Sequence, residues 1–563
     1  MTCARLRMTQ LASVFGVVLL TLASGANVFG QRIEVPDAVY FNGKVITVDT
    51  GNTVKEAFAV KGDKFLAVGA TRDMRALAGP QTQLIDLGGR AVMPGLMDNH
   101  NHAYHAAMAN RGIDVREVTS LAGLLDRIRQ AAAAAGPGKA VYVASGWDLS
   151  KFPEKREPTR QDLDGAAPNI PVVVFQNRGQ AYFNSAALKI AGVTRDIARI
   201  GRVTISKDST GEPDGSITGE SGTVARLTDM VSPATQAEKE RLIQDTQKGQ
   251  LALGLTSIRD LQLSPDFMRA YYEMWRTGKL LQRTSIGLQV NPTDMEGLED
   301  MLKGFGMGPG FGDNWLRLDC LAEFNGGMVW RGGTPAPNPN VTAEVYKRAV
   351  LIANRYGWRV SPHTDSDGMM DILLDAYEAA DRESSIKDKR WTIEHATYTQ
   401  PDQIDRIKRL GVVISAQLNA YRGNANAART LGKERAERAV PLREFLDKGI
   451  IVSGGSDWAG NSTSNNPFVI IYFYTTRIGA DGVPAGLAQK VSRTEAIRIA
   501  TINNAYTTFE ETIKGSIEPG KLADFVVLSA DIMTVPEAQI KDVLPLATFV
   551  GAKKAYAAPG SGF

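Results

Sequence analysis

Cysteine is nearly absent from the chain, which has only Cys3 and Cys320 among 563 residues. Because we expect Cys3 to leave with an N-terminal signal, the mature chain can form no internal disulfide and needs a large core for its stability. The sequence also lacks a run of basic residues, and its formal net charge is only +3. The missing basic run and the small net charge argue against a nucleic-acid partner, since proteins that bind nucleic acid carry basic stripes or patches.

The first 31 residues have the pattern of a secretory signal peptide. Arg5 and Arg7 precede an apolar stretch at 11–22, and small residues follow that stretch. The stretch is short for a full membrane span, which favours cleavage over the alternative of an uncleaved helix that anchors the chain in a membrane. We therefore expect an exported, periplasmic protein whose signal peptide spans residues 1–31 and which has no stable membrane insertion after cleavage.

Histidine is scarce as well, and its placement is informative. The chain has five histidines, and four of them fall at the ends of apolar, strand-like runs. His100 and His102 form an H-x-H pair whose two side chains point to the same face of a strand. His363 and His395 end two later runs, and Asp457 ends a further one. Imidazoles and carboxylates are ligands of zinc, so this set predicts a metal site.

Eight apolar runs alternate with helical patterns over most of the chain. The eight runs are 91–98, 254–261, 283–290, 316–324, 359–364, 391–395, 411–417 and 450–457. Eight βα units in this order predict a TIM (β/α)8 barrel, an α/β fold, over residues 91–505. Every candidate ligand lies at or just past the carboxyl end of a run, which is where such barrels carry out chemistry.

Short strands are expected before the barrel. Runs 39–41 and 44–48 flank Asn42–Gly43, a turn sequence that predicts a tight hairpin. Runs 58–60 and 65–68 flank a four-residue turn and predict a second hairpin. Both hairpins are predicted from local turn chemistry alone.

The two ends of the chain are expected to meet. Runs 523–528 and 547–551 are strand-like, and neither end of the chain is long enough to form a domain alone. We therefore expect residues 32–90 and 506–563 to form one composite β-sandwich. The long gap between the first two barrel strands predicts a lobe inserted over the barrel mouth after strand 1, at roughly residues 112–250.

Taken together, these motifs resemble the amidohydrolase superfamily, and within it the amidohydrolase 3 group of metal-dependent hydrolases, which includes N-substituted formamide deformylase. The resemblance covers almost the whole mature chain and is carried by Val92-Met-Pro-Gly-Leu-Met-Asp-Asn-His-Asn-His102, Ile393-Glu-His-Ala396, Gly454-Gly-Ser-Asp457 and the tail from Lys514 to Asp524. It implies a distorted TIM barrel with a composite β-sandwich, one or two divalent metal ions, usually zinc, and hydrolysis of a C–N bond. By position, the metal ligands would be His100, His102, His363 and His395, with Asp457 as the general base and a candidate ligand.

Two departures from the group bear on the site. Relatives often carry a lysine in a K-x-x-x-D-G run, but residues 321–326 contain no lysine and hold Glu323 instead. Glu323 could bridge two metal ions as a carboxylate, or it could lie behind the ligands or line the pocket, so the choice between one ion and two stays open. Gln180 stands where relatives often have a histidine before Asn-Ser, which predicts a changed substrate preference.

The combined prediction is a metal-dependent hydrolase, with Zn2+ as the expected ion, that cleaves a non-peptide C–N bond in a small-molecule amide, N-formyl compound or cyclic amide. The metal activates water, and Asp457 takes its proton as general base. We expect Asp98 to orient a ligand histidine and His105 to be a packing or surface residue.

Two alternatives to this function remain. A deaminase or C–O hydrolase of the same superfamily would show the same ligands. A non-catalytic periplasmic binding protein on this fold is the other alternative, although the intact ligand set argues against it, because a buried ionised carboxylate is costly without a metal or a proton. Neither the substrate nor the oligomeric state follows from the sequence.

Overall fold

The computed structural model describes residues 34–563 apart from 137, 144–146, 178, 201–202, 220, 291–294, 324, 334–337, 340 and 461–464. The expected signal peptide at residues 1–31 lies outside the described residues, so export stays a prediction. Among the described residues, no helix combines the length and the apolar character that crossing a bilayer requires.

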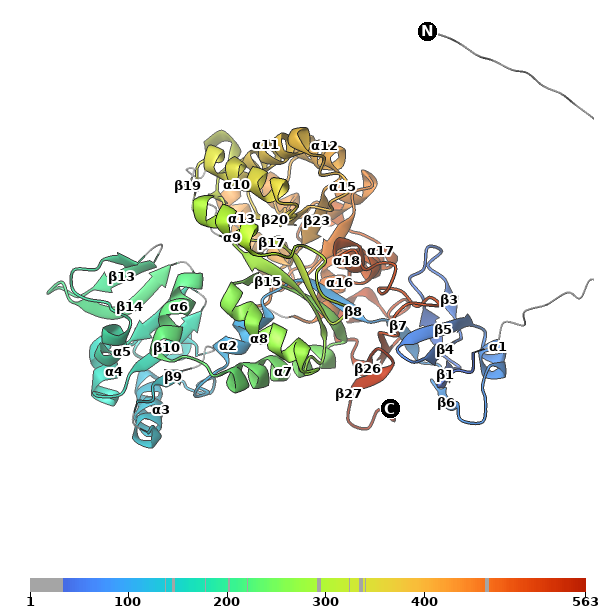
Figure 1. The fold of residues 1–563 in the computed structure, drawn as a ribbon, viewed down its shortest axis with the longest axis horizontal. Helices are drawn as coiled ribbons and strands as arrows, with labels where there is room; N and C mark the ends of the chain where they lie inside the picture. The colour runs from blue at the N-terminus through green and yellow to red at the C-terminus, as the bar shows by residue number, and fades with distance from the viewer. Residues whose placement is uncertain are drawn as a thin grey trace, which may run out of the picture.

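The centre of the molecule is a TIM-barrel-like α/β fold with parallel strands (Figure 1). The strands form two hydrogen-bonded sheets. The first contains, in order, β8 (Leu96–Asn101), β15 (Leu255–Leu263), β16 (Arg283–Gln289), β17 (Leu316–Ala322) and β20 (Val360–Ser361). The second contains β21 (His363–Thr364), β22 (Thr392–His395), β23 (Val413–Ala416) and β24 (Val452–Gly454). Pro362 separates β20 from β21 because proline lacks the amide hydrogen that a continuous ladder needs. A parallel bridge between Asn101 and Trp458 connects β8 to the segment after β24. Each of the eight predicted runs therefore contains or overlaps a barrel strand.

Helices alternate with these strands and pack on the outside of the barrel (Figure 1). They include α2 (Ala103–Ala109), α7 (Gln236–Ala252), α8 (Pro265–Arg276), α9 (Met295–Gly304), α10 (Ala343–Arg355), α11 (Asp367–Glu383), α12 (Pro401–Leu410), α13 (Asn419–Leu431), α15 (Leu442–Asp447), α16 (Pro467–Thr476), α17 (Arg493–Ile499) and α18 (Ile502–Thr507). Several of these helices begin with a side-chain cap, and α8 is an example. At the start of α8, Ser264 accepts a hydrogen bond from the amide of Phe267, and Pro265 lies in the first turn. The apolar faces of helices and strands form one large core.

Strands from both ends of the chain share one six-stranded sheet. Its order is β27 (Lys553–Ala557), β26 (Pro545–Val550), β25 (Phe525–Leu528), β7 (Ala91–Pro94), β2 (Lys44–Ile46) and β3 (Val54–Lys55). A four-stranded sheet packs against it in the order β5 (Lys64–Gly69), β4 (Ala57–Lys61), β1 (Ala38–Phe41) and β6 (Gln83–Asp86). The ring of Phe525 lies 4.4 Å from that of Phe549 and 4.9 Å from that of Phe58, measured between centroids. The two sheets therefore share one aromatic core.

The hairpin predicted at Asn42–Gly43 is wrong. β1 pairs with β4 and β6, whereas β2 pairs with β3 and β7 in the other sheet. Val39 and Val45 are each completely buried among these separate partners. Tertiary packing thus overrides the local turn signal. The second predicted hairpin is confirmed, because β4 and β5 pair antiparallel.

The first barrel strand also begins later than predicted. Ala91–Pro94 pairs with β2 and β25 in the sheet of the chain ends, and only Leu96–Asn101 pairs with β15 of the barrel. Gly95 lies between the two, where a Cβ atom would collide with the side chain of Thr256. The chain therefore changes sheets at a glycine because the backbone passes too close to Thr256 for any other residue.

The segment after β8 forms a separate six-stranded sheet at the left of Figure 1. Its order is β12 (Arg199–Ile200), β13 (Val203–Lys207), β14 (Pro213–Gly219), β11 (Gln180–Phe183), β10 (Val172–Asn177) and β9 (Val141–Val143). The helices of this region are α3 (Leu121–Ala134), α4 (Arg160–Ala166), α5 (Ser185–Ile190) and α6 (Ser221–Val231). By contrast, α7, which lies largely within the predicted lobe, contacts α2, α8 and β15 of the barrel.

Candidate metal centre

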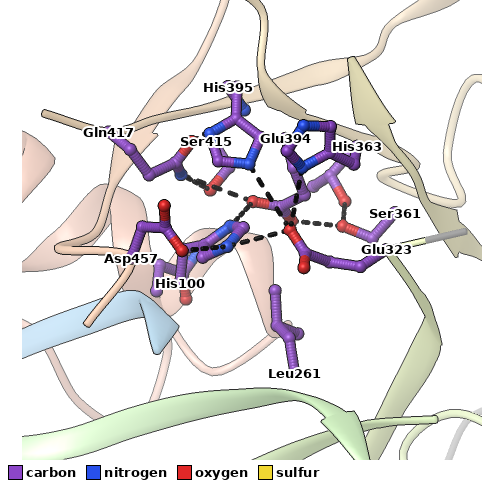
Figure 2. Close-up of polar contacts among 12 residues, drawn as sticks. His100, Leu261, Glu323, Ser361, His363, Glu394, His395, Ser415, Gln417 and Asp457 are labelled. Carbon is purple, nitrogen blue, oxygen red and sulfur yellow. Dashed lines mark hydrogen bonds and ion pairs between the residues drawn. The ribbon is translucent and has the colours of Figure 1, made fainter. Parts of the chain in front are cut away.

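The side chains selected as ligands come together at the carboxyl ends of the barrel strands, and Figure 2 labels all of them except His102. They are His100 in β8, His363 in β21, His395 at the end of β22, and His102, Glu323 and Asp457 shortly after β8, β17 and β24. Parallel strands end at one edge of a barrel, which is why residues so far apart in sequence meet here.

Glu323 lies at the middle of the cluster. Its Oε1 is 2.9 Å from His100 Nε2 and 3.5 Å from both His363 Nδ1 and His395 Nε2. Its Oε2 is 3.5 Å from His102 Nε2. The two oxygens of one carboxylate thus face imidazoles on different sides of the cluster.

Asp457 closes the cluster from the last strand. Its Oδ1 lies 3.3 Å from His102 Nε2 and 3.5 Å from His100 Nε2. Two groups of three side chains have potential ligand atoms within 4.8 Å of one another, namely His100, His102 and Asp457, and His100, Glu323 and His395.

The donor set has the chemistry of a divalent-metal site. Among the described residues, neither His100 Nε2 nor Glu323 Oε1 forms a hydrogen bond of acceptable geometry, and both ring nitrogens of His395 also lack one. A buried polar atom without a partner costs about 1–3 kcal/mol. A cation held by imidazole nitrogens and carboxylate oxygens would satisfy these atoms, so the residues fit an ion such as zinc.

The acids and imidazoles of the centre stabilise each other's charged forms. Burial alone would lower the pKa of His100, but Glu323 and Glu394 hold that pKa well above its usual value. Burial would raise the pKa of Glu323, yet the contacts with His100 and the other histidines keep it well below its usual value. A divalent cation at this position would take over the charge interactions of His100 with these carboxylates, and metal binding would release a proton from a protonated ligand histidine.

Comparison with known proteins identifies the family of this chain. The profile described as "Amidohydrolase family" matches residues 83–556, a span that includes every candidate ligand. The chain belongs to the amidohydrolase family. It is therefore an enzyme, a metal-dependent hydrolase that acts on carbon–nitrogen bonds.

Curated relatives align with this amidohydrolase over nearly its full length. N-substituted formamide deformylase of Arthrobacter pascens is 28% identical over 552 residues, which cover 94% of this chain and 100% of the relative. The putative amidohydrolase YtcJ of Bacillus subtilis (strain 168) is 25% identical over 522 residues, which cover 89% of this chain and 96% of the relative. The likeness thus extends through both chain ends as well as the barrel.

Solved structures of other hydrolases share the fold. An uncharacterized metal-dependent hydrolase from Pyrococcus horikoshii OT3 superposes with a TM-score of 0.72 at 20% identity, covering 89% of this chain and 99% of that one. Another from Pyrococcus furiosus gives a TM-score of 0.69 at 23% identity, covering 88% and 100%. These likenesses support the TIM-barrel-like architecture of this amidohydrolase.

Three of the candidate ligands have a left-handed backbone conformation, which residues other than glycine rarely adopt. The φ angle is 53° at Glu323, 68° at His395 and 54° at Asp457. Such strain costs about 1–3 kcal/mol per residue and clusters at functional sites. The amidohydrolase therefore directs these side chains into the centre at a cost in local stability.

Glu394 orients the His100 ring from behind the centre, although the sequence analysis did not select it. Its Oε2 lies 2.6 Å from His100 Nδ1, and its Oε1 accepts a hydrogen bond of 2.5 Å from Arg259 (Figure 2 shows the His100 contact). Burial would raise the pKa of Glu394, but Arg259 and His100 lower it to about 2, so the carboxylate is ionised. A carboxylate on one ring nitrogen fixes the other nitrogen toward a metal. The signal that could have revealed Glu394 is a charge within a buried strand, next to His395.

Asp98 orients the backbone around two ligands. It accepts hydrogen bonds from the amide of Ser456 at 2.9 Å, from the Ser456 hydroxyl at 2.6 Å and from the amide of His100 at 3.3 Å. Gly455 permits this close approach, because a Cβ atom there would collide with His100 and Asp98. Asp98 thus holds the backbone of His100, whereas Glu394 holds its ring.

His363 presents Nδ1 to the centre because its other nitrogen is engaged. Nε2 lies 3.0 Å from Asp365 Oδ2, and Nδ1 faces Glu323. Thr397 and Asn419 donate to the second oxygen of Asp365 at 2.5 Å and 2.9 Å. Asp365, which the sequence analysis also missed, therefore fixes the orientation of a candidate ligand.

His105 and Gln180 lie outside both groups of potential ligands, as does His363, whose Nδ1 lies 3.5 Å from Glu323 Oε1. The His105 ring packs against that of Phe267, and its Nε2 lies 3.3 Å from the carbonyl oxygen of Gln262. Gln180 is in β11 of the separate sheet, where its side-chain amide donates to Glu157 at 3.4 Å.

Proposed function

We propose that this amidohydrolase is a zinc-dependent enzyme that cleaves the C–N bond of a small amide, N-formyl compound or cyclic amide, with Asp457 as general base. The observation that carries the proposal is the convergence of four imidazoles with Glu323 and Asp457 at the ends of the barrel strands, where buried donor atoms lack hydrogen bonds among the described residues. The name of the full-length relative from Arthrobacter pascens supports an N-formyl substrate.

If the centre binds two ions rather than one, Glu323 lies between the two sets of ligands. Oε2 of Glu323 faces His102, whereas Oε1 faces His100, His363 and His395. His100, His102 and Asp457 would hold one ion, and His363, His395 and Glu323 would hold a second. A bound divalent ion would supply Lewis acidity and lower the pKa of water to about 7.

Asp457 is placed to move the proton in this reaction. Burial would raise its pKa, but the close contacts with His100 and His102 hold it well below its usual value, which favours the ionised carboxylate. Asp457 would take the proton of the attacking water and return it to the leaving nitrogen. Glu394, held by Arg259, would keep the His100 ring in one orientation throughout.

Zinc content and turnover test this proposal together. We expect the purified chain to hold about one or two zinc ions, and to hydrolyse an N-substituted formamide with a rate that a chelator abolishes and zinc restores. Asp457→Asn should lower kcat by about 10²–10⁴-fold. Asp481→Asn, at an exposed aspartate, is the matched control and should keep full activity.

The same assay separates the alternatives. Amidine and ester substrates, tested beside the amides, report on deamination and C–O hydrolysis. Full turnover by Asp457→Asn would show that another group is the base. A chain that binds no divalent metal after growth with zinc would contradict the metal centre and favour a binding protein.

The proposal also covers the parts around the barrel, residues 91–505. A composite β-sandwich of residues 32–90 and 506–563 is supported by the aromatic core that the two end sheets share. A lobe inserted at roughly residues 112–250 is supported by the separate sheet of β9 to β14. Export to the periplasm rests on the sequence of residues 1–31, and the mass of the chain recovered from the periplasm, with a new terminus near Gln31, is the test.

A further inference from the structure

A guanidinium group contacts the proposed base on the side away from the ligand histidines. Arg422, which the sequence analysis did not select, lies in the first turn of α13, the helix that follows barrel strand β23. Its Nη1 lies 3.3 Å from Asp457 Oδ2, and its Nη2 donates a hydrogen bond to the carbonyl oxygen of Ser456. The Arg422 side chain is 27% exposed and that of Asp457 is 17% exposed, so water only partly screens the contact.

The two oxygens of Asp457 consequently face different groups. Oδ1 faces the Nε2 atoms of His100 and His102, whereas Oδ2 faces Arg422. A planar guanidinium holds two acceptors in a fixed relation to each other. Here the two acceptors are the side chain of Asp457 and the carbonyl oxygen of the residue before it, so the contact restricts rotation of the carboxylate relative to its own backbone.

The backbone at this position also needs support. Asp457 has a φ of 54°, which is strained for a residue with a side chain. On one side of this turn, the amide of Ser456 donates to Asp98 at 2.9 Å and the amide of Asp457 donates to the His100 carbonyl at 2.8 Å. Arg422 contacts the carbonyl oxygen of the Ser456–Asp457 peptide. The backbone at Ser456 and Asp457 is therefore held by Asp98 and His100 through its amides and by Arg422 through its carbonyl oxygen.

We propose that Arg422 positions Asp457 for proton transfer, by holding Oδ2 and the Ser456 carbonyl oxygen so that Oδ1 faces the metal ligands. This inference rests on the proposed function, because it takes Asp457 as the base. Arg422 acts through Asp457 and has no role at the reacting atoms. A guanidinium at the barrel mouth could instead bind an anionic group of the substrate, and the two roles predict different kinetics.

The test compares Arg422→Gln and Arg422→Lys with Arg429→Gln in the full chain. Arg429 is the matched control, because it lies on the same helix, is exposed and donates to Asn426. We expect Arg422→Gln to lower kcat on an N-substituted formamide, or to weaken zinc affinity, by about 10–100-fold with KM unchanged. Arg422→Lys should fall between the wild type and Arg422→Gln, since an ammonium cannot hold both acceptors as a fork does. Arg429→Gln should match the wild type.

Zinc affinity, measured by competition with a chromophoric chelator, and the thermal unfolding midpoint give readouts that need no substrate. A loss confined to the Arg422 variants supports positioning, and so does a loss that disappears when Arg422→Gln is made in the Asp457→Asn background. Unchanged kcat and zinc affinity in Arg422→Gln would overturn the proposal. A raised KM for anionic substrates alone would also overturn it, in favour of substrate binding.

The design keeps the two proposals apart. If the wild type binds zinc but hydrolyses no amide, the proposed function fails, and zinc affinity still decides the role of Arg422. If Arg422→Gln does not fold, Arg422→Lys carries the comparison with Arg429→Gln.

Discussion

Two buried arginine–carboxylate pairs at opposite ends of the barrel strands can be compared, one behind the metal centre and one at the amino end of β16. Behind the centre, the side chains of Arg259 and Glu394 are 1% and 0% exposed. At the amino end, those of Arg283 and Asp524 are 2% and 5% exposed. In each pair a guanidinium nitrogen lies within 2.7 Å of a carboxylate oxygen, so neither burial nor distance distinguishes the pairs.

The two pairs differ in the groups with which they form their other hydrogen bonds. Glu394 contacts the ring of His100, whose Nε2 faces the centre. The other pair contacts backbone, because Asp524 accepts from the amide of Gly551 at 2.7 Å and Arg283 donates to the carbonyl of Asn314 at 2.9 Å. In barrels of this kind the carboxyl ends of the strands carry chemistry and the amino ends carry stability. We infer that one pair serves metal binding and the other joins the end sheet to the barrel.

The largest expected effect is at the amino end. Asp524→Asn leaves the Arg283 guanidinium buried without a counter-charge, which should reduce the free energy of unfolding by about 3–5 kcal/mol. Urea denaturation measures the change. Zinc content and kcat of the folded variant should equal those of the wild type, because the pair lies away from the centre.

An exposed ion pair provides the control for this prediction. Lys448 and Asp405 are 52% and 53% exposed and lie 2.5 Å apart, so Asp405→Asn should cost less than about 1 kcal/mol. Equal losses of unfolding free energy in Asp524→Asn and Asp405→Asn would mean that burial of the Arg283 pair does not add to its contribution to stability. A drop in zinc content in Asp524→Asn would remove the distinction between the two pairs.

Both pairs also show what a sequence predicts and what it does not. The barrel strands and the ligand histidines follow from local pattern, because each ligand stands at the end of an apolar run that is visible by itself. Arg259 and Glu394 are 135 residues apart, and Arg283 and Asp524 are 241 apart. Which buried charge meets which depends on the order of strands around the barrel, and no local pattern contains that order.

The failed hairpin has the same cause. The backbone does bend at Asn42–Gly43, with Asn42 in the left-handed region at a φ of 57°. The strands on either side then pair with segments brought in from elsewhere in the chain, including β7 and β6. The Asn-Gly sequence therefore predicts the left-handed residue at Asn42 correctly and the pairing of the flanking strands wrongly. Arg422 was missed for a related reason, since a helix residue after β23 contacts Asp457 only once the barrel has formed.

An intermediate effect is expected behind the metal centre. Glu394→Gln keeps the size of the side chain but removes the charge that holds the His100 ring, so zinc affinity or kcat should fall by about 10–100-fold. The stability loss should be smaller than in Asp524→Asn, because Arg259 keeps Asp319 as a counter-charge at 2.5 Å. Chelator competition and urea denaturation measure the two quantities.

Glu378→Gln is the matched control for that variant. Glu378 pairs with Arg406 on the outer helices and is 29% exposed, so this change should leave zinc affinity unaltered. If Glu394→Gln loses stability as Asp524→Asn does and keeps its zinc affinity, both pairs are structural and the comparison between them fails.

The smallest expected effect tests most strictly whether packing at the amino end of the barrel affects catalysis at the carboxyl end. Phe525→Leu should cost about 1 kcal/mol of unfolding free energy, because it removes the ring contacts with Phe549 and Tyr40 but leaves an apolar side chain in the core. Phe525 is paired with Pro94 in β7, which continues through one glycine into β8 and so to His100. A shift of the backbone in the end sheet could therefore reach His100 through this short stretch of chain. If Phe525→Leu lowers the unfolding midpoint and leaves kcat unchanged, packing in the end sheet does not affect catalysis at the centre, although β7 and β8 connect the two directly. A lower kcat in this variant would show that packing in the end sheet does affect catalysis.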